Sequence, residues 1–198
     1  MRTKVLLGAA VALMLVVSVA TIGSNMGFKI SIPLAAGGYL NWIALPYYDS
    51  YSNAAAIFSD IPSCTQVSRW DNPSGSYQTW NGVKGTNFTP VAGEAYLVKV
   101  SVAGNWVVVG SHNPGFALSL SGNGALNWIS VPYHTVDTNA AALFSEISSC
   151  TQVSRWDNTS GSYQTWNGVK GTNFTLTPGE GVLVKVSATT VPWTPAHY

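Results

Sequence analysis

Charged residues, histidines and cysteines are all scarce in this sequence. Asp, Glu, Lys and Arg together make up 9% of the 198 residues, against about 25% in an average soluble domain. The formal net charge is +1, so the strongly basic character that accompanies nucleic-acid binding is missing, and we expect no nucleic-acid partner. Gly, Ser, Thr and Asn are abundant instead, a profile common among exported proteins.

Groups that often carry catalysis are equally sparse. The three histidines, His112, His134 and His197, have no counterparts in the internal repeat described below. The sequence contains neither the G-x-S-x-G elbow of serine hydrolases nor the H-E-x-x-H helix of metalloproteases. We therefore predict that the protein is not an enzyme and that it uses no cofactor or metal ion.

The first twenty residues have the composition of a secretory signal peptide. Arg2 and Lys4 precede an unbroken apolar run from Val5 to Val17, and small residues lead up to Ala20, where we expect cleavage. The apolar stretch is shorter than the roughly 20 residues that a membrane-spanning helix needs, so a retained anchor is the weaker alternative. The mature chain is then secreted or displayed on the extracellular cell surface, with no stable membrane span.

A long stretch of the sequence occurs twice. Residues 64–89 read CTQVSRWDNPSGSYQTWNGVKGTNFT, and residues 150–175 differ from them only where Thr159 replaces Pro73. Around these segments, residues 41–101 align without a gap onto residues 127–187, at an offset of 86 and with 45 identities in 61 positions. We therefore divide the mature chain into two tandem modules, residues 21–110 (module 1) and residues 111–198 (module 2).

Each module combines several strand signals with one helix signal. Alternating or continuous apolar runs predict strands at 28–32, 40–45, 95–100 and 106–109. Residues 53–61, repeated at 139–147, instead begin with an Asn suited to a helix N-cap and continue with three Ala and apolar residues at helical spacing. We predict a mainly β fold with two small β-sandwich or barrel-like modules in tandem, each with one short α-helix.

The repeated stretch itself predicts a hairpin. Two strand-like segments, 65–70 and 76–80, flank the turn composition Asp71-Asn72-Pro73-Ser74-Gly75. Oxygen atoms in this turn are potential Ca²⁺ ligands, but only one of the groups is charged, so an Asx-turn is the preferred interpretation. Glu94, which recurs as Glu180, is expected to form an ion pair with an Arg or Lys of its own module.

Aromatic residues of the hairpin are the best candidates for a binding surface. Strand alternation turns one set of side chains toward the core and the other outward. Trp42 and Trp70 are expected in the core, because burying a Trp gains roughly 4–6 kcal/mol. The outward set combines rings with amides, as sugar-stacking platforms and subunit contacts do. The ligand or interface candidates are Tyr77, Gln78, Trp80 and Asn81 in module 1, and Tyr163, Gln164, Trp166 and Asn167 in module 2.

The only two cysteines, Cys64 and Cys150, occupy equivalent positions just after the predicted helices. In an exported protein such thiols tend to be oxidised. A disulfide between them requires Cα atoms within about 4.4–6.8 Å, and hence a packing of the two modules on their helix sides. A bridge to another chain and two buried free thiols are the alternatives.

The two modules differ at their ends. The tail after Ser187 contains Pro192 and Pro195, and Pro cannot donate to a sheet ladder. The last strand of module 2 is therefore predicted to be short or absent, which would leave this module without an edge strand that module 1 has.

A repeated frame runs through both modules. It comprises Trp42 to Pro46 and Ala92-Gly93-Glu94-Ala95-Tyr96 in module 1, then Trp128 to Pro132 and Pro178-Gly179-Glu180-Gly181 in module 2. This frame resembles that of poorly characterised secreted β-modules in bacterial cell-surface proteins. The resemblance implies an extracellular setting without known catalysis, and it transfers no functional residue.

These observations favour an exported structural or adhesive protein, self-assembling as a subunit of an extracellular filament, sheath or surface layer. An unfilled edge would accept a strand from the next subunit. The candidate assembly strand near the mature N-terminus contains Gly27, Phe28, Ile30 and Ile32. The alternative is a carbohydrate-binding module with one aromatic site per repeat. The expected partners are thus further copies of the chain, or glycans.

Overall fold

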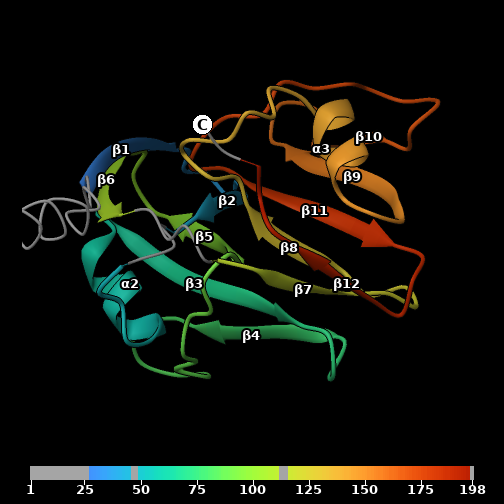
Figure 1. Ribbon diagram of the computed structural model, residues 1–198. Helices are drawn as coiled ribbons and strands as arrows, with labels where there is room; N and C mark the ends of the chain where they lie inside the picture. Colours follow the sequence, from blue (N-terminus) through green and yellow to red (C-terminus); the bar gives the residue numbers. More distant parts are fainter. Residues whose placement is uncertain (1–26, 46–48, 112–115, 197–198) are drawn as a thin grey trace, which may run out of the picture.

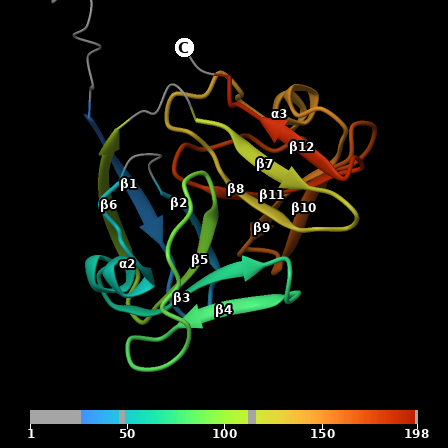
Figure 2. The same cartoon turned by 60° about the horizontal axis from the view of Figure 1, so that its bottom comes forward.

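The computed structural model describes residues 27–45, 49–111 and 116–196, so the predicted signal peptide lies outside the described residues. Figure 1 shows a mainly β molecule with two similar halves, and Figure 2 shows the same halves from a second direction. In the part of the chain that is described, no helix has the length and apolar character needed to cross a membrane.

Module 1 is built on one four-stranded antiparallel sheet with the strand order β2-β5-β3-β4. A two-stranded ribbon, β1 with β6, and the helix α2 pack on one face of this sheet. The elements are β1 (Gly27–Leu34), β2 (Asn41–Ala44), α2 (Ala54–Asp60), β3 (Cys64–Asp71), β4 (Ser76–Trp80), β5 (Ala95–Val100) and β6 (Gly104–Ser111).

The core of module 1 lies between these layers. The ribbon contributes Trp106, the helix contributes Ile57, and the sheet contributes Val67 and Val98, none of them more than 1% exposed. The helix begins where the sequence predicts, because the Asn53 side chain accepts a hydrogen bond from the Ala56 N–H at 2.9 Å. The cap therefore fixes the helix against the core that it helps to close.

Module 2 repeats this architecture, with the strand order β10-β9-β11-β8 and a ribbon of β7 with β12. Its elements are β7 (Leu118–Ser121), β8 (Asn127–Ser130), α3 (Ala140–Glu146), β9 (Cys150–Asp157), β10 (Ser162–Trp166), β11 (Gly181–Val186) and β12 (Thr190–Trp193). The prediction that module 2 lacks an edge strand is wrong, because β12 pairs with β7 over four residues. The prolines of the tail shorten this strand without removing it.

The two modules pack through the second faces of their four-stranded sheets. Along β5, Tyr96 and Val98 point into the core of module 1, whereas Leu97 points to a third cluster shared with module 2. In this cluster the rings of Trp42 and Trp128 stack with centroids 3.3 Å apart and an interplanar angle of 6°. Since the two Trp residues are equivalent in the repeat, the modules are related by an approximate twofold axis that passes between them.

The arrangement confirms a mainly β fold with two sandwich-like modules, each with one short helix. The sheets formed by the described residues do not close into a barrel, so the barrel description is too loose. Because each helix and the opposite module lie on different faces of a sheet, the helices are turned away from the module boundary (Figure 1).

Candidate functional site

The tip of each hairpin reaches across the module boundary and is held there by an Asn. The Asn72 Oδ1 accepts hydrogen bonds from the indole N–H of Trp70 and from the Leu126 N–H, both at 2.9 Å. Its amide also donates to the Leu126 carbonyl at 3.3 Å. Asn158 makes the equivalent pair of bonds to Leu40, at 3.0 and 3.1 Å. Two identical clamps therefore join the modules.

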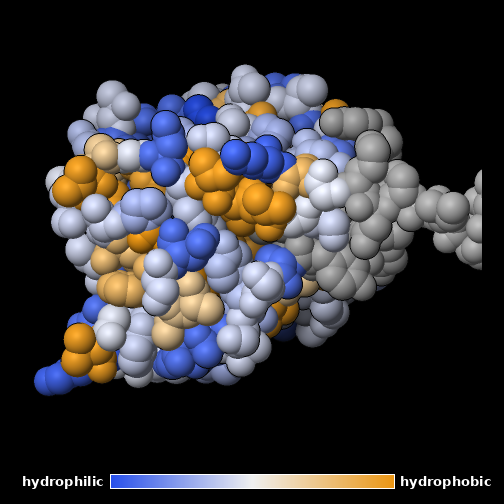
Figure 3. Space-filling model, turned by 90° about the vertical axis from the view of Figure 1, so that its left-hand side faces the viewer, coloured by the Kyte–Doolittle hydropathy of each residue, from blue (hydrophilic) through white to orange (hydrophobic). Residues whose placement is uncertain are grey.

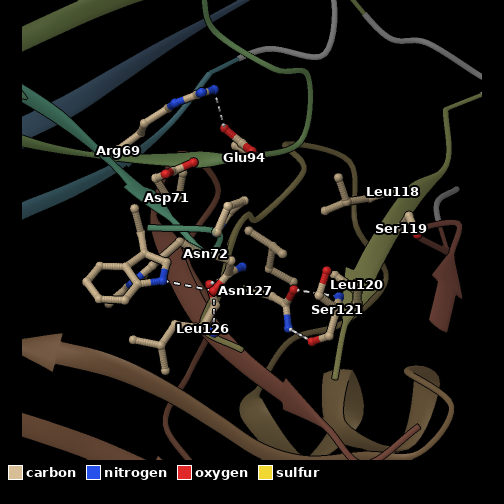
Figure 4. A pocket seen from close by; sticks show the side chains of 15 residues that line it. Arg69, Asp71, Asn72, Glu94, Leu118, Ser119, Leu120, Ser121, Leu126 and Asn127 are labelled. Atoms are coloured by element: carbon tan, nitrogen blue, oxygen red, sulfur yellow. Dashed lines mark hydrogen bonds and ion pairs between the residues drawn. The ribbon is translucent and has the colours of Figure 1, made fainter. Parts of the chain in front are cut away.

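Beside the Asn72 clamp lies a hollow of about 220 Å³, called groove 1 here (Figure 4). One wall comes from the hairpin and the start of β5 in module 1, and the other comes from β7 and the start of β8 in module 2. Figure 4 shows Arg69 and Glu94 at one end, with Ser119 and Ser121 across from them. The lining includes Arg69, Trp70, Asp71, Asn72, Glu94, Ser119, Ser121, Asn127 and Trp128.

A second hollow of about 270 Å³, called groove 2 here, lies beside the Asn158 clamp. The roles of the modules are exchanged in it, since module 2 supplies the hairpin wall and module 1 supplies β1 and β2. Its lining includes Arg155, Trp156, Asn158, Glu180, Ser31, Asn41 and Trp42. Each groove thus contains the same Arg, Trp, Asn and Glu from one module and an Asn-Trp pair from the other.

The arginine of each groove is fixed in place before any ligand binds. Arg69 donates from Nε to the Gln78 side chain at 2.8 Å and from Nη1 to the Thr89 carbonyl at 3.3 Å. Its guanidinium also lies over the Phe88 ring, 5.3 Å from the centroid. Arg155 has the same three kinds of contact in module 2. Such preorganisation lowers the entropic cost of using the guanidinium as a hydrogen-bond donor.

The acid of each groove pairs with that arginine, which confirms the arginine option of the predicted ion pairs. The distance is 3.8 Å between Arg69 and Glu94 and 3.9 Å between Arg155 and Glu180. Burial raises the pKa of Glu94, and the charge of Arg69 and a hydrogen bond from Tyr96 partly oppose this rise. The pKa of Glu180 is raised for the same primary reason. These carboxyls are thus less solvated than ordinary surface acids.

The predicted aromatic candidates do not form one surface. Tyr77 packs edge-on against Trp70, with centroids 5.0 Å apart, and remains 43% exposed beside the module boundary. Trp80 lies on the other face of β4 and packs against the core of module 1. Tyr163 and Trp166 are separated in the same way in module 2. The prediction of a platform that combines the Tyr and the Trp of one hairpin is therefore wrong, because residues three apart in a strand point to opposite faces.

The amide candidates hold the hairpin together instead. Gln78 and Gln164 accept hydrogen bonds from the groove arginines. Asn81 accepts from the backbone N–H groups of Val83 and Lys84 at 3.1 and 2.8 Å and so closes the next turn. Asn167 does the same in module 2. None of the eight predicted site residues lines groove 1 or groove 2, but the glutamines orient the arginines of both grooves.

The expected core tryptophans lie at the module boundary rather than in the module cores. Trp42 is 8% exposed and belongs to the cluster shared by both modules, and Trp70 packs against that cluster. The Asp71 carboxylate accepts from the Ser74 N–H at 3.2 Å, three residues on, because Pro73 has no N–H. The bond of an Asx-turn, two residues on, is formed in module 2, where the Asp157 carboxylate accepts from the Thr159 N–H at 3.0 Å.

Cys64 and Cys150 are both free thiols, so the disulfide considered between the modules is not formed. The required packing on the helix sides does not occur, since the modules meet on the opposite sheet faces. Each thiol donates to a nearby backbone carbonyl, Cys64 to Gln66 and Cys150 to Gln152. Burial raises the pKa of both thiols to about 11.

The candidate assembly strand is already occupied. Gly27, Phe28, Ile30 and Ile32 all lie in β1, which pairs with β6 over eight residues within the same chain. Ile32 is also 6% exposed and part of the core of module 1. Donation of this segment to another subunit would require its release from β6 and from the core of module 1.

Sequence reasoning missed the residues that build the grooves. The composition of residues 71–75 predicts a turn at Asn72, but the bonds of Asn72 to Leu126 link positions 54 residues apart. The available signal was the repeat itself, because Arg69, Trp70, Asn72 and Glu94 all recur unchanged in module 2. Recurrence of polar residues that a module core does not need points to the boundary between the modules.

Within the described residues, no three His, Cys, Asp or Glu side chains gather as a set of metal ligands. Comparisons of the chain with protein-family models, with curated proteins and with solved structures find no match. The chemistry of groove 1 and groove 2 is therefore the basis for assigning a function.

Proposed function

We propose that the chain is an exported adhesive protein that binds carbohydrate in groove 1 and groove 2. The observation that carries the proposal is the duplication of the site. The same four side chains of each module face the same Asn-Trp pair of the other module. Two equivalent sites on one chain supply the multivalency on which adhesion depends.

The lining of the grooves suits a ligand that carries many hydroxyl groups. The guanidinium and carboxylate groups offer donors and acceptors side by side, and the indole rings provide an apolar wall. Volumes of about 220 and 270 Å³ are below the roughly 300–1,000 Å³ of drug-sized pockets. The grooves therefore fit one or two sugar rings of a longer glycan.

The charges of the grooves favour a neutral glycan. In groove 1 the single base, Arg69, faces two acids, Asp71 and Glu94. In groove 2 Arg155 faces Glu180. The arginine is in each case already paired with an acid, so a polyanionic glycan would meet repulsion from the carboxylates without a free cation to offset it.

The proposal is tested by exchanging the groove acids for amides of the same shape. The doubly substituted chain Glu94→Gln with Glu180→Gln should lose about 10- to 100-fold in affinity, because a hydrogen bond to a charged group contributes about 1.5–3 kcal/mol. A neutral-glycan array followed by calorimetry measures this loss. The matched control, Lys84→Gln with Lys170→Gln, alters the exposed turns that follow the same hairpins and should bind as the unsubstituted chain does. Unchanged affinity in the Glu variant, or the absence of any neutral ligand, would refute the proposal.

A second function, as a subunit of a filament, sheath or surface layer, is favoured by the outer edge of β6. Val107 and Val109 are 43% and 65% exposed, and β1 is the only strand paired with β6 among the described residues. Figure 3 shows hydrophobic residues on the side of the molecule that carries β1, β6 and α2. An apolar strand with an unpaired edge is a site at which chains associate.

Electron microscopy of the secreted protein tests this second function. Ordered polymers of the unsubstituted chain should disappear with Val109→Lys, because a charge on the strand prevents edge pairing. They should persist with Val83→Lys, a control at a position that is 80% exposed in a turn. Dispersed monomers of the unsubstituted chain would contradict assembly and leave glycan binding untouched.

A further inference from the structure

The contacts between the two modules are made twice, by equivalent residues. The Ala44 N–H donates to the Gly179 carbonyl at 2.9 Å, and its counterpart Ser130 donates to the Gly93 carbonyl at 2.8 Å. The two Asn clamps and the stacked Trp pair follow the same rule. An interface in which residue i meets residue j and j meets i is isologous, as in a twofold homodimer.

Each module therefore carries the whole recognition surface. The side chains that form it in module 1 are Leu40, Trp42, Asn72 and Leu97, and they recur as Leu126, Trp128, Asn158 and Leu183 in module 2. Nothing in these contacts distinguishes the module of the same chain from the corresponding module of a second chain.

At the centre of the interface the two modules are not equivalent. Ala95 stands where module 2 has Gly181, and a Cβ atom built on Gly181 would lie 2.4 Å from the Ala95 Cβ. Carbon atoms pack at about 3.5–4.0 Å, so two Ala residues do not fit here. A pair of two modules 1 would set Ala95 against Ala95 with this overlap, whereas a pair of two modules 2 would set Gly181 against Gly181 without it.

A second difference acts in the same direction. The Ser130 hydroxyl donates to the Glu94 carbonyl across the boundary at 2.7 Å, and Ala44 at the equivalent position has no hydroxyl. An unlike pair makes this bond once and a pair of two modules 2 makes it twice. A pair of two modules 1 does not make it at all.

We propose that the module boundary is a docking surface for a second copy of this chain, with a pairing rule set by Ala95 and Gly181. Module 2 pairs with either module of another copy when its own partner is displaced, and module 1 does not pair with module 1. This inference is independent of glycan binding, because it rests only on the contacts between the modules.

Two blocked full-length chains test the pairing rule. Ala95→Leu blocks the surface of module 1 and leaves module 2 intact, so this chain should form a dimer of twice the monomer mass by light scattering. Gly181→Leu blocks module 2 and leaves only module 1, so this chain should stay monomeric. In a mixture, an affinity-tagged Gly181→Leu chain should retain the untagged Ala95→Leu chain, and tagged unsubstituted chain is the control that should not retain it.

The result that overturns the proposal is equally definite. Each module has its own core, with Val67 and Val153 fully buried, so both blocked chains are expected to keep their β circular dichroism. If a Leu variant loses it, Ala95→Val and Gly181→Val take its place. Folded chains that stay monomeric both alone and mixed, a dimer of the Gly181→Leu chain, or unfolding of all four variants would each show the proposal to be wrong.

Discussion

The two modules are nearly identical in the hairpins that form the grooves, but they differ at the centre of their interface and in their two-stranded ribbons. Their hairpins differ at one residue in 26, and both hairpins place the same clamp and ion pair at the boundary. By contrast, β1 and β6 pair over eight residues whereas β7 and β12 pair over four. The equivalent residues Ala95 and Gly181, which meet at the centre of the interface, also differ in size. The twofold arrangement thus combines identical residues at the paired sites with residues of different size on the axis itself.

The largest effect on stability is expected from placing Ala at both equivalent positions on the twofold axis. Gly181→Ala should lower the free energy of unfolding by about 1–3 kcal/mol, since overpacking costs this much, and Gly181 is not among the glycines with positive φ, so Ala brings no backbone strain. Adding Ala95→Gly should restore most of the loss by moving the methyl group to the other module. Urea unfolding measures both chains, and a double variant as unstable as the single one would contradict the size-matching account.

The next-largest effect is expected in the pH dependence of stability, where module 2 differs from module 1. Tyr51 donates to Asp60 at 2.6 Å in module 1, but the equivalent pair in module 2 is Asp137 with Glu146. Burial, then the hydrogen bond and charge of Glu146, raise the pKa of Asp137 from 3.8 to about 7. A raised acid pKa means that the folded state holds the proton more tightly than the unfolded state.

The Asp137 carboxyl therefore makes its full contribution to stability below about pH 4, and this contribution is lost as the pH rises through about 7. Asp137→Asn should flatten this part of the stability profile, because the amide keeps the protonated shape without titrating. Thermal unfolding at several pH values provides the measurement, and Asp71→Asn in the exposed hairpin turn is the control. A profile unchanged by Asp137→Asn would show that other groups determine the pH response.

Local sequence pattern predicts most of the secondary structure within one module. Asn53 before three Ala marks the start of α2, and the composition of residues 71–75 marks the turn between β3 and β4. Local sequence pattern does not predict which surface an apolar strand face packs against. In β5, Tyr96 and Val98 face the core and Leu97 faces the other module, and a strand buried on both sides appears in sequence only as a continuous apolar run.

The candidate site was harder to predict for the same reason. The ion pair of Arg69 with Glu94 lies within one module and agrees with the sequence prediction, but groove 1 lies between the modules, which are joined there by the bond of Asn72 to Leu126. The face of the hairpin on which Trp80 lies follows from strand alternation. The surface that covers the opposite face depends on how the modules pack, and no residue spacing encodes that.

A smaller effect, equal in both modules, is expected at the helix caps. Asn53 and Asn139 accept hydrogen bonds from Ala56 and Ala142 at 2.9 and 3.0 Å. Replacing either Asn by Ala should cost about 1 kcal/mol, and the two losses should add, because the sites lie in separate cores. Denaturant unfolding of the two single variants and the double variant tests this. Unequal losses would reveal that one module limits the stability of the chain.

The smallest effect is expected from the two thiols, which are alike in both modules. Burial raises the pKa of Cys64 and of Cys150 to about 11, so little thiolate is present at neutral pH, and the nucleophile needed for oxidation is scarce. Replacing both by Ala should therefore change the free energy of unfolding by much less than the roughly 4 kcal/mol that a disulfide between Cys64 and Cys150 would contribute by closing the loop between them. Electrophoresis with and without reductant should likewise show one unchanged band. A loss near 4 kcal/mol together with a band of monomer mass that shifts on reduction would mean that the modules can meet on their helix sides. The contact of Ala95 with Gly181 would then belong to only one of two packings.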